Sequence, residues 1–339
     1  MKKVFQFFAL IVTIGCGIFP ASAEDAQPSN VVELGKDDSH VILETPQNLT
    51  EAYGIMGGSL TITGPDTEVV QNIPASNTTS DGMSFLKYWP WGEGTVTVEN
   101  GATLKSNTEL FWGGASADKR YANNVRKLVV QSGAEAIFSP ESGEVCICSP
   151  WADKFHNAWV VVIGSGSKLL LPDKVYLSNK NQYEGHPGTL EIFDGAYAEM
   201  GTLYAGYSAG TLRLVVSNAT LKATGGIYCY KNSNRWTGGT FIFRDCLVET
   251  PLFKFSYPAT AHCGDKVTFN GAVFRPVGVP ADKFIDGPPT IAEKNAKFFV
   301  EGPGLIIDAP ESALLEVTPL LQGSGGFVKR GNGTVILSA

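Results

Sequence analysis

Hydrophobic and polar residues alternate in short segments along most of the chain. Residues 188–210 hold one full copy of the pattern: an alternating segment, a corner of small residues, a second alternating segment, a glycine and the short segment LYAGY. Residues 95–98 and 212–216 repeat the first of these segments. An apolar period of two predicts β-strands, because successive side chains in a strand point to opposite faces. The pattern therefore predicts a fold made of short strands.

Two sets of equivalent positions indicate that these strands belong to one repeating module. The corners recur every 23 to 33 residues, and the short segments begin every 24 to 35 residues, in step with the corners. The corner residues are Gly101, Gly133, Gly166, Gly195, Asn218, Cys246 and Gly271, and the short segments begin at Leu110, Val145, Val175, Leu203, Ile227 and Leu252. A module of this length buries its apolar face only against a stacked neighbour, whereas a propeller blade needs about 40 to 50 residues.

The sequence thus predicts an all-β fold, namely a single-stranded, right-handed parallel β-helix (a β-solenoid). Right-handedness follows from the crossover preference of parallel strands. We expect about nine turns between Gly64 and Gly302, stacked at about 4.8 Å each into a rod of roughly 40 Å. Aliphatic columns such as Val175, Leu203 and Ile227 are expected to line its interior.

The sequence divides into three parts. Residues 1–23 form a cleaved signal peptide, because Lys2 and Lys3 precede an apolar run that ends in a small-x-small cleavage site at 21–23. Residues 24–57 lack the repeat and are expected to form an N-terminal cap. Residues 58–339 form the β-helix domain, with a loop-rich interruption near 277–289. The signal predicts a secreted protein located outside the cell, on its surface or in the periplasm.

The last segment carries a recognisable motif, GSGGFVKRGNGTVILSA at 323–339. It resembles the autotransporter-associated β-strand repeat of bacterial passenger-type proteins. The matching residues are Gly323, Gly325, Gly326, Phe327, Lys329, Gly331, Gly333, Thr334, Val335, Leu337 and Ser338. The G-T-[LV] openings at Gly94, Gly188 and Gly210 are similar to the looser turns of the same proteins. The resemblance implies a right-handed parallel β-helix that is exported and displayed on, or released from, a bacterial cell.

The strand expected at 334–338 is apolar, and no charged or proline-bearing cap follows it. An unpaired strand edge of low charge is a template for pairing with another chain. We therefore expect self-association through this C-terminal edge.

Composition limits the range of partners. Removal of the signal leaves 24 basic against 33 acidic residues, a net charge near −9. Nucleic acid is excluded as an expected partner, because its binding depends on clustered Lys and Arg that neutralise phosphates. No later apolar run reaches the ~20 residues that a membrane span needs, so we expect none after signal cleavage.

Cysteines and histidines indicate no metal or cofactor. Five cysteines follow the signal, an odd number, and we interpret them as buried thiols. Cys146 and Cys148 lie too far apart along one strand for a disulfide, and a C-x-C pair lacks the usual zinc spacing. Cys246 with Cys263 is the one disulfide pairing worth testing. The four histidines are scattered, and no catalytic triad, phosphate loop or calcium repeat is present.

Parallel β-helices also host polysaccharide lyases and glycosidases, so a carbohydrate-active enzyme is the alternative hypothesis. Adjacent turns could bring Asp194 and Asp245 within the 5 to 10 Å or so that a glycosidase pair needs. Both residues fall at corners, however, where acidic residues are ordinary. The sequence favours solvated turn acids, and no catalytic residue is assigned.

Aromatic residues recur at the second position of the short segments. Alternation places them opposite the aliphatic column, on the outer face. The predicted binding ladder consists of Phe111, Tyr176, Tyr204, Tyr228 and Phe253. One interpretation is a flat platform for a glycan or a cell-surface protein; the other is that loops fold over these rings and form a second small core. The function expected from the sequence is a structural, adhesive or surface-binding role without catalysis.

Overall fold

A computed structural model describes residues 31–34, 40–49, 52–55, 58–72, 84–88, 94–107, 109–113, 125–147, 157–177, 188–205, 212–230, 238–256, 265–278, 280, 282–288 and 296–338. The expected signal peptide at 1–23 lies outside these residues.

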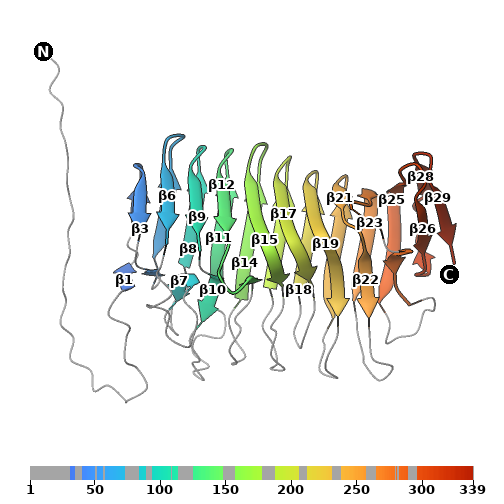
Figure 1. Cartoon of the computed structure of the whole chain (residues 1–339), viewed down its shortest axis with the longest axis horizontal. Coiled ribbons are helices and arrows are strands. Elements are labelled where there is room, and N and C mark those ends of the chain that lie inside the picture. The colour runs from blue at the N-terminus through green and yellow to red at the C-terminus, as the bar shows by residue number, and fades with distance from the viewer. Residues whose placement is uncertain are drawn as a thin grey trace, which may run out of the picture.

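The described chain is an all-β solenoid in which the paired strands run parallel. Figure 1 shows the turns side by side along the long axis of the molecule, with the N-terminal turns at one end and β29 at the other. This confirms the predicted repeat and its parallel stacking. The three strands of each turn contribute to three ladders, which we call the first, second and third sheets in the order in which the chain enters them.

The first sheet consists of eleven strands or strand segments: β2 (His40–Leu43), β5 (Ser59–Thr63), β8 (Gly94–Glu99), β11 (Val125–Gln131), β14 (Asn157–Ile163), β16 (Gly188–Phe193), β18 (Leu212–Ser217), β20 (Gly239–Arg244), the first halves of β23 (Lys266–Arg275) and β25 (Lys297–Asp308), and β27 (Leu321–Gln322).

The second sheet consists of β3 (Gln47–Leu49), β6 (Glu68–Gln71), β9 (Thr103–Ser106), β12 (Glu135–Phe138), the first halves of β15 (Lys168–Tyr176), β17 (Tyr197–Tyr204) and β19 (Thr220–Tyr230), β21 (Leu247–Glu249), the second halves of β23 and β25, and β28 (Phe327–Arg330).

The third sheet begins with β1 (Val31–Leu34), β4 (Ala52–Ile55), β7 (Ser84–Tyr88) and β10 (Glu109–Gly113). These four strands form a hydrogen-bonded ladder of their own. Beside β10 lies β13 (Glu144–Cys146), which begins the rest of the third sheet: the second halves of β15, β17 and β19, β22 (Phe253–Ser256), β24 (Lys283–Asp286), β26 (Leu314–Val317) and β29 (Thr334–Leu337).

The corners between the first and second sheets change along the chain. Early corners contain two left-handed residues, as at Asn100 and Gly101, with φ of 54° and 78°. Later corners are one residue shorter and contain a single left-handed residue, Asn218 or Asp245, with φ of 49° and 45°. Asn, Asp and Gly are the residues that adopt this conformation at least cost. A shorter corner removes one residue from a turn, whereas the spacing of the corners falls from 32 or 33 residues to between 23 and 28, so the corners account for only a small part of this drift.

Interior columns lie where the alternation predicted them. Val145, Val175, Leu203 and Ile227 pair in register and are fully buried. The next member is Phe253 and not the expected Leu252, because Thr250 and Leu252 exchange side-chain to backbone hydrogen bonds in a turn that delays the strand by one residue. The expected column is thus correct over four turns and shifted in the fifth.

The interior changes from aliphatic to aromatic along the axis. Of the seven largest fully buried side chains in the described residues, six follow residue 240: Phe241, Phe243, Phe253, Phe269, Phe274 and Phe284. Their rings contact one another across turns; the ring centroids of Phe243 and Phe274, for example, lie 5.2 Å apart in an edge-to-face arrangement. Such pairs add to the stabilisation that burial alone supplies.

Strand pairing extends through two segments for which the sequence predicted other roles. Within the expected cap at 24–57, β2 and β3 already pair in register with β5 and β6. Within the expected interruption at 277–289, β24 pairs with β22 and β26 in the third sheet. The ladder therefore extends on both sides of the span from Gly64 to Gly302, since β27, β28 and β29 follow it. No helix in the described residues has the length and apolarity to cross a membrane.

Glycines of the C-terminal motif let the last described turn stack closely on the one before. A Cβ at Gly323 would lie 2.3 Å from the carbonyl oxygen of Val300, and one at Gly331 would lie 2.1 Å from that of Ala309. Both glycines also have positive φ, 114° and 73°. The motif that carries the family resemblance is therefore a stacking device in this chain.

Candidate functional site

Three tyrosines from the predicted aromatic ladder stack on the outer face of the third sheet. Tyr176, Tyr204 and Tyr228 pair in register on β15, β17 and β19. Ring centroids of the first pair lie 5.0 Å apart with an interplanar angle of 13°, and those of the second lie 5.6 Å apart at 25°. The sequence prediction of an outward aromatic column is thus correct for these three residues.

The rings do not form an open flat platform. Because each ring lies against the next, the ring faces between them are covered. Tyr176 is buried and forms a small cluster with Cys146, against which half-buried Tyr204 packs. Burial, together with the nearby carboxylate of Glu144, raises the pKa of the Tyr176 hydroxyl, which donates a 3.4 Å hydrogen bond to that carboxylate. At this end the rings belong to a small buried cluster, while the loops that could cover them lie outside the described residues.

The other two ladder residues lie elsewhere. Phe253 is fully buried in the interior column, so its expected place on the outer face is wrong; Lys254 follows Tyr228 in the outer column and pairs with Asp286 at 3.4 Å. The one-residue delay of β22 is the cause. For Phe111 the structure describes only the backbone, in which it pairs with Leu86 of β7.

The two carboxylates considered as a glycosidase pair are corner residues. Asp194 and Asp245 have left-handed φ of 55° and 45°, and the corner of Asn218 lies between them. Their short polar side chains account for their presence at these positions. Nothing in this arrangement directs them across a shared substrate bond.

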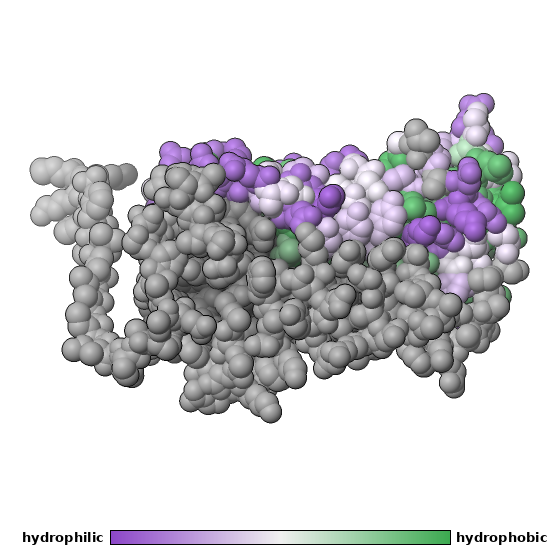
Figure 2. Space-filling model, turned by 60° about the horizontal axis from the view of Figure 1, so that its bottom comes forward, coloured by the Kyte–Doolittle hydropathy of each residue, from purple (hydrophilic) through white to green (hydrophobic). Residues whose placement is uncertain are grey.

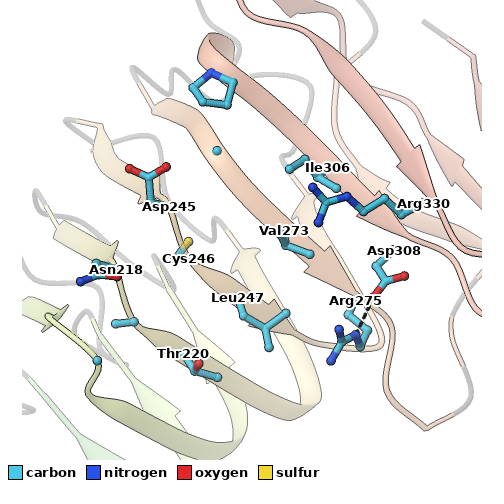
Figure 3. A pocket seen from close by; sticks show the side chains of 14 residues that line it. Asn218, Thr220, Asp245, Cys246, Leu247, Val273, Arg275, Ile306, Asp308 and Arg330 are labelled. Atoms are coloured by element: carbon cyan, nitrogen blue, oxygen red, sulfur yellow. Dashed lines mark hydrogen bonds and ion pairs between the residues drawn. The ribbon is translucent and has the colours of Figure 1, made fainter. Parts of the chain in front are cut away.

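A shallow groove of about 620 Å³ runs across the turns on the outer face of the second sheet (Figure 3). Its floor is an apolar column in which Leu247, Val273 and Ile306 pair in register. Exposed corner residues, including Asn218 and Asp245, line one rim. Arg275, Asp308 and Arg330 line the other (Figure 3). The groove therefore follows the axis of the solenoid, with an apolar floor between two polar rims.

The charged rim continues as a ladder of alternating sign. In successive turns it contains Glu199, Lys222, Glu249, Arg275, Asp308 and Arg330. Arg275 is paired on both sides: its Nε donates to Asp308 at 2.8 Å and its Nη1 to Glu249 at 3.3 Å. Lys222 donates to Glu199 at 2.9 Å. These groups stabilise neighbouring turns against one another, and the exposed Arg330 guanidinium faces the groove at its C-terminal end.

Cys246 lines the groove, but its thiol is chemically quiet. It is 5% exposed and free. Cys263, with which a disulfide was worth testing, lies outside the described residues. Burial, reinforced by the adjacent Asp245 carboxylate, raises its pKa to about 12. A thiol that stays protonated at neutral pH is a poor nucleophile. Cys146 and Cys229 are buried as well, as the sequence predicted for these thiols.

Within the described ranges, no three His, Cys, Asp or Glu side chains converge in a way that could hold a metal ion. Comparison with known protein families, characterised proteins and solved structures finds no match.

The groove was not predictable from the sequence, because it requires the register of the second sheet. The alternation of acidic and basic residues in the ladder is visible in the sequence only once the shortened corners at Asn218 and Asp245 are aligned. The signal that could have revealed the groove is the pair of apolar residues that follow the corners of Asp245 and Gly271. Leu247 and Val273 stand there at positions that Glu135 and Lys168 occupy in earlier turns.

Proposed function

We propose that this protein is an exported, right-handed β-solenoid that binds an extended glycan at a cell surface and performs no chemistry on it. The groove on the second sheet is the observation that carries this proposal. It runs along the axis, which suits an elongated ligand. Its apolar floor suits the C–H face of a sugar, and its polar rims suit the hydroxyls. The signal at 1–23 and the autotransporter-like motif at 323–339 support export and display.

The pairing of charged groups favours a non-catalytic binding protein over an enzyme. An enzyme needs acids and bases held in a site with shifted pKa values and a substrate between them. In the ladder, Lys222 and Arg275 hold their acidic partners across turns instead. Such pairs stabilise the stack of turns and leave the groove without a proton donor opposite a base.

The test is a glycan array probed with the purified protein and two variants. Val273→Glu places a charge on the groove floor, and we expect it to reduce the array signal at least tenfold. Thr97→Glu, also half-buried on an outer face but on the first sheet, should leave the signal unchanged. Equal glycan binding by the two variants would show that the groove is not the binding site. Shortening of a bound glycan during incubation would favour the alternative, a carbohydrate-active enzyme.

A further inference from the structure

Charge is distributed differently on the first and second sheets. In the charged ladder of the second sheet, basic residues alternate with acidic ones, and Lys222 and Arg275 are paired with acidic neighbours. On the first sheet, one outer column carries Lys127, Arg213, Lys266 and Lys297. The register brings these four residues into line along the axis, and no carboxylate occurs in the column between them. In a chain with a net charge of −7, a column of one sign is unexpected.

Repulsion within the column destabilises the fold where the cations are closest. Lys266 and Lys297 are direct neighbours in the register, about 4.8 Å apart along the axis, and like charges in such positions repel. Neither forms an ion pair with any described residue. Lys266 lies instead over the ring of Phe299, with its Nζ 5.1 Å from the ring centroid. The contact with Phe299 stabilises the Lys266 side chain, but no carboxylate of the described residues neutralises either ammonium group, so both charges are left for a partner outside the fold.

The middle of the column is organised around a buried acid in the neighbouring outer column. Glu191 is 8% exposed, and its two carboxylate oxygens accept hydrogen bonds from the Nε1 of Trp159 and the Nε of Arg213, each at 2.9 Å. Lys127 lies over the Trp159 ring at 4.4 Å from its centroid. Glu191 thus fixes the indole and the guanidinium, while the Arg213 side chain stays 46% exposed and can still donate from its outer nitrogens.

We propose that this column is a second binding surface, distinct from the groove, and that its ligand is a linear polysaccharide of carboxylated sugars. From Lys127 to Lys297 the column crosses six turn spacings, roughly 29 Å at about 4.8 Å each. One turn is comparable to the length of one sugar in an extended chain. The four cations lie three, two and one turns apart along the column, so carboxylates at those intervals on one chain can meet all of them. Arg213 matches a carboxylate with two parallel donors, and Thr189 and Thr240 supply hydroxyls between the cations.

A nucleic acid fits this surface less well. Single strands bind through aromatic platforms on which successive bases stack, combined with a dense basic groove. The column offers one indole, and Lys127 occupies one of its faces. The cations are spaced along one line, with threonines between them, which suits a polymer that carries both carboxylates and hydroxyls.

The experiment is affinity electrophoresis in gels that contain polygalacturonate. We expect wild-type protein to be retarded, with the retardation lost as salt rises, because exposed charges are screened within about 8 Å at physiological ionic strength. The double variant Lys266→Gln/Lys297→Gln should bind at least tenfold more weakly. The matched control Lys168→Gln/Lys283→Gln removes two exposed lysines from the other sheets and should change binding less than twofold.

Two further measurements distinguish the column from the groove and carboxylated polymers from other polymers. Val273→Glu should leave polygalacturonate binding intact, because the groove lies on another sheet; loss of binding in that variant would overturn the assignment to the column. Retardation is also measured in gels that contain dextran sulfate, neutral dextran or single-stranded poly(dT), and comparison with polygalacturonate identifies the class of polymer that binds. Three results would overturn the proposal. They are no retardation by polygalacturonate, stronger retardation by dextran sulfate or poly(dT) than by polygalacturonate, and an equal loss of polygalacturonate binding in the two double variants.

Discussion

At Asn100, Asp194 and Asp245 the backbone passes through the left-handed region, with φ of 54°, 55° and 45°. Their side chains are short and polar, and for such residues this conformation costs least after glycine. On sequence grounds alone, Asp194 and Asp245 are also candidates for a catalytic pair. Local backbone chemistry explains why short polar residues occupy these corners, so their presence there does not by itself indicate catalysis.

Glu199 shows how a single outward residue contributes to pH dependence. The hydroxyl of Tyr197 and the ammonium of Lys222 both donate to its carboxylate, and these hydrogen bonds hold its pKa below the ordinary value. Because the folded pKa lies below the unfolded one, about 4.3, the stabilisation is present above that pH and is lost as pH falls through the folded pKa.

Glu199→Gln should therefore lower the free energy of unfolding at pH 7, by less than about 1 kcal/mol because the pair is partly exposed. The difference from wild type should shrink at pH 3, because below the unfolded pKa the unfolded chain takes up the proton first and the stabilisation decreases. Urea unfolding at both pH values measures it. Glu311→Gln, at an exposed corner, serves as the control. If the difference in unfolding free energy between Glu199→Gln and wild type were the same at pH 7 and pH 3, the Glu199 carboxylate would not be the source of this pH dependence.

At the scale of the strands, alternation predicted the interior columns and the outward tyrosines, because a period of two fixes which face a side chain occupies. It failed where turns changed length. Pro251 and its neighbours delay β22 by one residue, so Phe253 lies in the interior and not on the predicted outer face. The groove and the cationic column were not predictable either, since both depend on register between strands about 25 residues apart, which no local pattern contains.

The glycines of the C-terminal motif allow a matched test of close stacking. Gly323→Ala should destabilise the last described turn by about 1 to 3 kcal/mol, because φ is 114° and the new Cβ would meet the Val300 carbonyl. Gly326→Ala should have little effect, since its Cβ would meet nothing within 4 Å. Hydrogen exchange of the β28 amides reports both. Equal protection in the two variants would show that the turn does not depend on this contact.

At the scale of the whole molecule, a solenoid exposes its end turns. Among the described residues, the exposed large hydrophobic side chains are Ile42 in β2 and Leu314, Val328, Ile336 and Leu337 in the last turns. Figure 2 shows hydrophobic surface gathered at the end of the molecule that the C-terminal turns form. We infer that this end associates with a second copy, by strand addition to the edge of the last turn.

Ile336→Lys should reduce that association, because a charge on the edge strand disfavours pairing. In sedimentation velocity, wild-type protein should show a sedimentation coefficient that rises with concentration, and the variant should not. Thr97→Lys, in the body of the first sheet, should behave as wild type. A wild-type protein that stays monomeric at every concentration would refute the inference.

The ladder of alternating charge also constrains how such a chain can change in length. Removing the one turn that carries Glu249 would set Lys222 beside Arg275, and like charges directly opposite each other cost roughly 0.2 to 1 kcal/mol. Removing the turns of both Glu249 and Arg275 would instead set Lys222 beside Asp308, an attractive pair. In this part of the solenoid, two turns can therefore be gained or lost together while every charged residue keeps a neighbour of opposite charge. Insertion or deletion of a single turn places two like charges next to each other at the junction.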